Sequence, residues 1–184
     1  MIWALVAGVA AILVLIFILN PARNAIRLTL AAAYARRRGD AALEENLYRQ
    51  AVDVAAKLKE PLRSKIEGHV EIQWGGLNYR KGQLREAEDL IRRGLVKASI
   101  STQREYAVVQ EGYIQWGDLC VDQGRYYDAE EHYRQALEND EKTGNVAGIR
   151  FELQKIGDVL IRQGRKEDAD ELVQRAAALD ATPR

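Results

Sequence analysis

The side chains that most often carry catalysis or bind metal ions are few in this sequence. There is one cysteine, Cys120, and there are two histidines, His69 and His132. A structural zinc site needs four such ligands, so the sequence predicts neither a metal nor a cofactor. Cys120 falls on an apolar helical pattern, which favours a small buried residue over a catalytic thiol. Neither histidine has neighbours that would form a catalytic dyad, and no phosphate-binding glycine motif is present. We expect a protein that is not an enzyme and takes no small-molecule substrate.

The overall composition excludes a further class and indicates the fold class. The chain of 184 residues carries 27 lysines and arginines against 27 aspartates and glutamates. No basic stripe with interleaved aromatic residues is present, so we expect no nucleic-acid partner. Proline is scarce, and helix-forming Ala, Leu, Arg, Glu and Gln dominate. The elements that position any functional side chain are therefore expected to be helices.

The first twenty residues have the composition of a membrane-spanning helix. Ile2 to Leu19 is a run of 18 residues without a charged side chain, and a helix of that length spans about 27 Å. No positively charged segment precedes the run, and Asn20-Pro21 follows it where a signal-peptide cleavage site would lie. We expect residues 1–20 to form a transmembrane signal-anchor helix rather than a cleaved signal peptide. Asn20 and Pro21 also predict the start of a new helix, with almost no linker.

Basic residues follow this apolar run without an acidic one up to residue 38. They are Arg23, Arg27, Arg36, Arg37 and Arg38. The positive-inside rule predicts a single-pass membrane protein with its N-terminus outside and its C-terminal domain in the cytoplasm. We expect these arginines at the membrane surface, against anionic lipid headgroups. The alternative is that residues 36–38 only form a solvated helix end.

Small and aromatic residues recur at fixed spacing through the rest of the chain. The first glycine of each unit stands seven positions before a second one, in the pairs Gly75 and Gly82, Gly117 and Gly124, and Gly157 and Gly164. An alanine follows five residues later, at Ala87, Ala129 and Ala169. Three units thus lie at about residues 68–109, 110–149 and 150–184, and a weaker one at 25–67. Small residues are needed where two helices cross closely, and the second glycines suit the left-handed end of a helix. Thr102 and Glu105 predict a capping box.

The stretch WGDLCVDQGRYYDAEEHYRQAL in the third unit resembles the tetratricopeptide repeat, although Trp74 and Trp116 stand where that family usually has leucine. The resemblance implies an all-α protein in which residues 21–184 form a right-handed α-solenoid of about four helical hairpins. The unit spacing of 40–43 residues is similar to that of the longer-helix subclass found in kinesin light chains.

The resemblance also implies that the first helix of each hairpin lines a partner-binding groove. Transferred residue by residue, the polar groove positions are Gln73, Tyr79, Arg80, Glu111, Gln115, Asp118, Asp122, Lys155, Asp158 and Arg162. The first unit contributes Ile26, Thr29, Leu30, Ala33, Arg36 and Arg37. Thr29 and Ala33 stand where the family's chaperone-binding clamp has lysine and asparagine, which argues against a chaperone co-factor. Residues 102–142 hold ten acidic residues against four basic ones, so the groove centre favours a basic partner segment. The alternative is that these carboxylates only solvate a helix face.

Two functions remain in competition. The first is a membrane-anchored scaffold or adaptor that holds a partner protein at the membrane surface or assists assembly of a membrane complex. The second is an accessory subunit of a multi-subunit membrane complex, held partly through its transmembrane helix. Small residues that would suit such helix packing are Ala4, Ala7, Gly8, Ala10 and Ala11.

Overall fold

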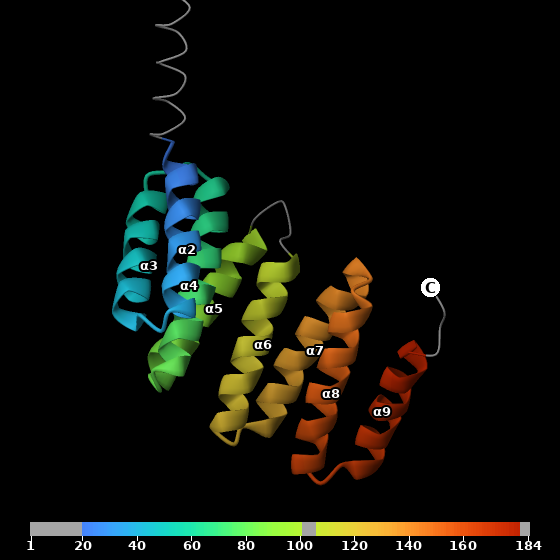
Figure 1. Ribbon diagram of the computed structural model, residues 1–184. Helices are drawn as coiled ribbons and strands as arrows, with labels where there is room; N and C mark the ends of the chain where they lie inside the picture. The colour runs from blue at the N-terminus through green and yellow to red at the C-terminus, as the bar shows by residue number, and fades with distance from the viewer. Residues whose placement is uncertain (1–19, 101–105, 181–184) are drawn as a thin grey trace, which may run out of the picture.

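The computed structural model describes residues 20–100 and 106–180, and this part of the chain is entirely helical (Figure 1). Its helices are α2 (Pro21–Arg37), α3 (Ala41–Ala55), α4 (Leu62–Arg80), α5 (Leu84–Ile100), α6 (Tyr106–Asp122), α7 (Tyr126–Thr143), α8 (Val146–Arg162) and α9 (Lys166–Asp180). Within these ranges no helix combines the length and apolar character needed to cross a bilayer. The predicted anchor at residues 1–20, apart from Asn20, and the predicted capping box at Thr102–Glu105 lie outside the described residues.

The helices form four consecutive hairpins, α2/α3, α4/α5, α6/α7 and α8/α9. Each second helix also packs against the first helix of the next hairpin, and α4 touches both α2 and α6. The first helices all begin at one end of the stack, and the second helices begin at the other (Figure 1). The prediction of an all-α stack of four hairpins is confirmed. The predicted unit starts at Gly68, Gln110 and Arg150 lie inside α4, α6 and α8.

The predicted helix start at Asn20 and the predicted left-handed glycine turns are confirmed. The side chain of Asn20 caps α2 by accepting hydrogen bonds from the backbone N–H groups of Ala22 (3.0 Å) and Arg23 (3.3 Å). Gly82 and Gly124 have φ angles of 75° and 72°. Side chains rarely adopt this left-handed backbone, so glycine there allows the tight turn between the two helices of a hairpin.

The core consists of two large apolar clusters joined by a small one. The first lies between hairpins one and two and includes Tyr48 and Val70. The second lies between hairpins three and four and includes Tyr133 and Ile156. The small cluster of Ile72, Ile91 and Leu95 contacts residues of α6, among them Trp116, which also packs against the second large cluster. Each hairpin thus buries its apolar face only by stacking on a neighbour.

Candidate partner-binding groove

The first helices of the hairpins share one face that is hollowed by three pockets, and we call this face the groove. An apolar pocket of about 460 Å³ and a central pocket of about 360 Å³ lie across α2, α4 and α6, and they share Thr29, Leu30 and His69. A charged pocket of about 290 Å³ lies farther along the stack, across α4, α6, α7 and α8. The groove therefore changes from apolar to charged as it passes from the first hairpin to the fourth.

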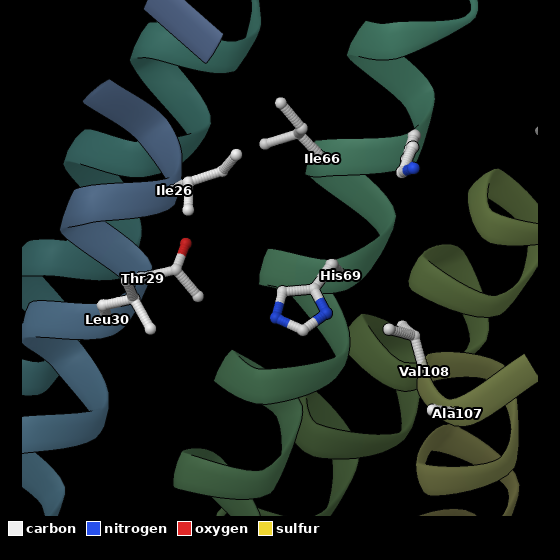
Figure 2. Close-up of a pocket in the computed structure, with 8 residues that line it drawn as sticks. Ile26, Thr29, Leu30, Ile66, His69, Ala107 and Val108 are labelled. Carbon is white, nitrogen blue, oxygen red and sulfur yellow. The ribbon is translucent and has the colours of Figure 1, made fainter. Parts of the chain in front are cut away.

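The apolar pocket is formed by side chains from the early turns of three helices. Figure 2 shows Ile26 and Thr29 of α2 on the side toward Ile66 and His69 of α4, with Leu30 beside Thr29 and Val108 of α6 on the far side. Leu30 is 66% exposed. A large apolar side chain kept in water at the rim of a pocket lowers its free energy when a partner covers it. This end of the groove is suited to apolar side chains of another molecule.

The central pocket is lined by polar groups that connect three successive hairpins. The guanidinium of Arg36 donates a hydrogen bond to Gln73 Oε1 (2.5 Å), and Gln73 Nε2 donates to Glu111 Oε2 (2.6 Å). Gln115 Nε2 donates to the other carboxylate oxygen of Glu111 (3.2 Å). These bonds fix the lining of the groove, because Arg36, Gln73 and Glu111 of successive hairpins are held to one another.

Arg36 and Arg80 both bind one buried carboxylate, that of Glu44. Glu44 Oε1 lies 3.3 Å from Arg36 Nε and 2.7 Å from Arg80 Nη2, and the hydroxyl of Tyr48 donates to the same oxygen (3.2 Å). The Glu44 side chain is almost fully buried. Burial, opposed by the hydrogen bond from Arg36, raises the pKa of Tyr48 and keeps its hydroxyl protonated. Arg80, predicted as a groove contact, thus joins the first hairpin to the second.

In the charged pocket, two of the three predicted aspartates, Asp118 and Asp122, are already partnered. Asp118 Oδ1 accepts hydrogen bonds from the hydroxyl of Tyr133 (2.6 Å) and the ammonium of Lys155 (2.8 Å). Asp122 accepts one from the hydroxyl of Tyr79 (2.6 Å). Burial together with these carboxylates raises the pKa values of both tyrosines. The negative charge that the sequence predicts for the groove centre is therefore partly offset within the protein.

The remaining charged residues of this pocket are Asp158 and Arg162 of α8. The Arg162 guanidinium lies 5.7 Å from the centre of the Tyr126 ring, in a cation–π contact. Of the ten predicted polar groove residues, six line the charged pocket: Tyr79, Asp118, Asp122, Lys155, Asp158 and Arg162. Gln73 and Glu111 line the central pocket.

The five arginines predicted at the membrane surface are not brought together. Arg23 and Arg27 lie in the first two turns of α2, and Arg36, Arg37 and Arg38 lie at its far end. At 1.5 Å per residue the two groups are separated by roughly 15 Å along the helix. Arg36 and Arg37 line the central pocket, while the Arg38 guanidinium lies over the Tyr34 ring, 5.8 Å from its centre.

Seven residues that line these pockets were not predicted: Tyr48, Lys65, Ile66, Ala107, Val108, Tyr133 and Val159. Those at positions 65, 66, 107 and 108 precede the unit starts assigned from sequence, because α4 and α6 begin several residues earlier than those starts. The apolar residues that precede Gly68 and Gln110 in the sequence were the signal that could have indicated these earlier helix starts. Tyr133 belongs to a second helix, α7, and reaches the charged pocket past Gly117, which has no side chain to block it.

The aromatic and thiol groups singled out in the sequence have packing roles. The Trp116 ring stacks on the His132 ring with centroids 4.1 Å apart, and its N–H donates to Glu88 Oε1 (3.1 Å). Trp74 packs against the first large cluster. Burial lowers the pKa of His132, and it raises the pKa of the fully buried Cys120 thiol to about 11. These groups hold helices together.

Comparison with known proteins agrees with this architecture. The Tetratricopeptide repeat family model matches residues 109–181. The crystal structure of BtubC (BKLC) from P. vanneervenii is similar with a TM-score of 0.61 and 15% identity, over 92% of this chain and 88% of that one. The crystal structure of MamA protein is similar with a TM-score of 0.50 and 15% identity, over 85% of this chain and 92% of that one. No curated protein matches at a significant level. The family match thus covers tetratricopeptide repeats in the third and fourth hairpins, and the two solved structures are alike in fold along most of the chain.

Proposed function

We propose that this protein is a non-catalytic, membrane-anchored scaffold that holds a segment of a partner protein in the groove. The observation that carries the proposal is the continuity of the apolar and central pockets across α2, α4 and α6. A tetratricopeptide fold is suited to protein partners, since stacked repeats create an extended binding surface. The partner segment supplies large apolar side chains to the apolar pocket and polar or charged groups toward α8.

The groove is preorganised for such binding. Its polar residues are held by hydrogen bonds between repeats, such as those from Arg36 to Gln73 and from Gln73 to Glu111. Less side-chain entropy is therefore lost when the partner binds. A basic residue of the partner would meet the exposed carboxylates of Asp122 and Asp158. Asp118 is less available, because it is already paired with Lys155.

Membrane attachment is the second part of the proposal. It is supported by the apolar run from Ile2 to Leu19 in the sequence and by Asn20, whose cap starts α2 directly after that run. The repeats would then lie close to the bilayer, on the cytoplasmic side by the positive-inside rule.

The experiment places a photo-crosslinking amino acid at position 30 or position 96 of the full chain in its native membranes. Leu30 lines the groove, and Val96 is a comparably exposed apolar residue (56%) on the second helix α5. We expect a protein crosslinked from position 30 and not from position 96. Equal crosslinking from both positions, or from neither, would overturn the groove as the binding site.

A matched pair of substitutions then tests affinity. Leu30→Glu should release the crosslinked companion during detergent purification, whereas Val96→Glu should retain it; both side chains are exposed, so the melting temperature should change little in either variant. A companion retained by Leu30→Glu but lost when residues 2–19 become polyleucine would instead identify an accessory subunit held through its membrane helix.

A further inference from the structure

The end of the stack where α2 begins carries a dense group of basic side chains. Residues 20–28 and 56–65 contain six basic residues and one acidic residue, Glu60. We call this group the basic end; it consists of Arg23, Arg27, Lys57, Lys59, Arg63 and Lys65. The sequence separates its two parts by about thirty residues, and the structure unites them.

The union rests on packing in the first apolar cluster. Leu58, which lies between the two lysines of the α3–α4 loop, packs against the same cluster as Ala22 in the first turn of α2. Lys65 and Ile26 line one pocket. Figure 1 shows the α3–α4 loop beside the start of α2. The cations of the loop and of α2 therefore face the same region of solvent.

The charges of the two loop lysines, Lys57 and Lys59, are not offset by an ion pair among the described residues. Glu60 is engaged by Arg63 (2.7 Å), and it also accepts a hydrogen bond from the backbone N–H of Ser64 (3.1 Å). Lys57 and Lys59 are both exposed. Leu62, which follows the loop as the first residue of α4, is 41% exposed among these cations.

The basic character is confined to the first two hairpins. At the same end of the stack, residues 138–150 hold Glu138, Asp140 and Glu141 against Lys142 and Arg150. The positive charge is thus greatest where the chain continues from its apolar run. Arg23 follows Leu19 by four residues, and a chain of that length spans at most about 14 Å.

From this placement we propose that the basic end is a lipid-contact surface that binds anionic headgroups of the bilayer and sets the array upright on it. Each lysine or arginine near an anionic bilayer strengthens binding about fivefold, and this effect falls off within a Debye length. Leu62 enters the headgroup region beside the lysines. The inference rests on the membrane attachment in the proposed function, and it names surface residues outside the apolar run.

The test uses the full chain with Leu62→Cys carrying an environment-sensitive dye, in nanodiscs of phosphatidylcholine with or without about 30 mol% phosphatidylglycerol. Cys120 is buried with a raised pKa, so labelling is selective for position 62. We expect blue-shifted emission about twofold brighter in the anionic bilayer, which about 0.5 M salt reverses by screening. Identical emission in the two bilayers would overturn the proposal and leave the basic end to an acidic protein partner.

Charge reversal provides the matched comparison. Lys57→Glu/Lys59→Glu should abolish the anionic response, since losing two attractive charges weakens the contact about 30-fold or more. Arg85→Glu/Lys166→Glu makes the same change at two exposed residues at the opposite end of the stack and should retain the response. A response unchanged by the first pair would refute the assignment. Release of the chain from membranes by alkaline carbonate would refute the anchor instead, while the dye response to added vesicles still reports on the basic end.

Discussion

Gly117 of α6 packs against the ring of Tyr133 of α7 so closely that a Cβ at this glycine would lie 2.4 Å from Tyr133 Cε1. The contact brings the two helices of the third hairpin together and lets the Tyr133 hydroxyl reach Asp118. The equivalent glycine of the fourth hairpin, Gly157, has more space: the nearest atom to its Cβ would be the Ala169 carbonyl oxygen, 4.0 Å away.

Alanine at these two glycines should therefore have opposite effects. Gly117→Ala forces the Tyr133 ring to move and should destabilise the array by about 1–3 kcal/mol, the usual cost of overpacking. Gly157→Ala meets only ordinary contacts and should stabilise by up to about 1 kcal/mol, because alanine is the better helix former. Chemical denaturation followed by circular dichroism measures both, and a similar destabilisation by the two would contradict the difference in space.

The recurrence of small residues predicts the hairpins, because the close helix crossing and the left-handed turn both depend on residue type. It does not show which of the aligned glycines is sterically required. Gly117 faces a tyrosine ring, whereas Gly157 has room for a Cβ, and this difference depends on the side chains that the opposite helix presents.

The buried carboxyl pair Asp140 and Glu152 should make stability depend on pH. The Gln110 side-chain amide donates to both, Asp140 is 3% exposed, and Glu152 is fully buried. Burial, aided by the charge of Asp140, raises the pKa of Glu152 to about 7 from 4.5. Between these two pKa values the folded protein holds a proton that the unfolded chain releases. The contribution of Glu152 to the free energy of unfolding is therefore fully present below about pH 4.5 and is lost as the pH rises through 7. The loss is on the order of 3 kcal/mol.

Thermal melting at about pH 5 and about pH 8 tests this dependence. Glu152→Gln keeps the shape and removes the ionisation, so it should raise the melting temperature at the higher pH and flatten the profile. A profile identical to that of the unmodified protein would show that Glu152 titrates normally.

Arg80 should matter for stability more than for partner binding. Arg80→Met removes one of the two cations that bind the buried Glu44. It should lower the free energy of unfolding by about 1–3 kcal/mol, which is less than the cost of removing a sole partner, because Arg36 remains. A double-mutant cycle with Glu44→Gln measures the coupling. If Arg80→Met reduced crosslinking at position 30 and left the free energy of unfolding unchanged, Arg80 would instead be a residue that contacts the partner in the groove.

Cys120 should resist modification in the folded protein. Its pKa of about 11 makes the reactive thiolate about 100-fold rarer near neutral pH than for an ordinary thiol, and burial hinders the reagent further. Val173→Cys adds an exposed thiol on α9 as an internal control. Thiol titration of this variant should show one fast and one slow phase; two equally fast thiols would mean that α6 is not packed as described.

The groove was predictable in outline, since corresponding positions of the first helices line one face of a repeat array. Which of its charges are satisfied was not predictable from any one repeat. The bonds from Arg36 to Gln73, Gln73 to Glu111, and Lys155 to Asp118 join residues 37 or 38 positions apart. This separation is about one helical turn shorter than the repeat, so a polar pair recurring at that spacing is the signal to search for. The full lining of the apolar pocket was not predictable, because α4 and α6 begin earlier than the glycine pattern indicates.

The division of the core into two large clusters has an evolutionary consequence. Hairpins one and two share one cluster, hairpins three and four share the other, and the small cluster around Ile72, Ile91 and Leu95 joins them. A recombination event at that seam would exchange one half while leaving the interior of the other intact. Because the apolar and charged pockets both take side chains from α4 and α6, such an exchange would join the two sides of each pocket in new combinations, and new partner preferences could arise without the evolution of a new fold.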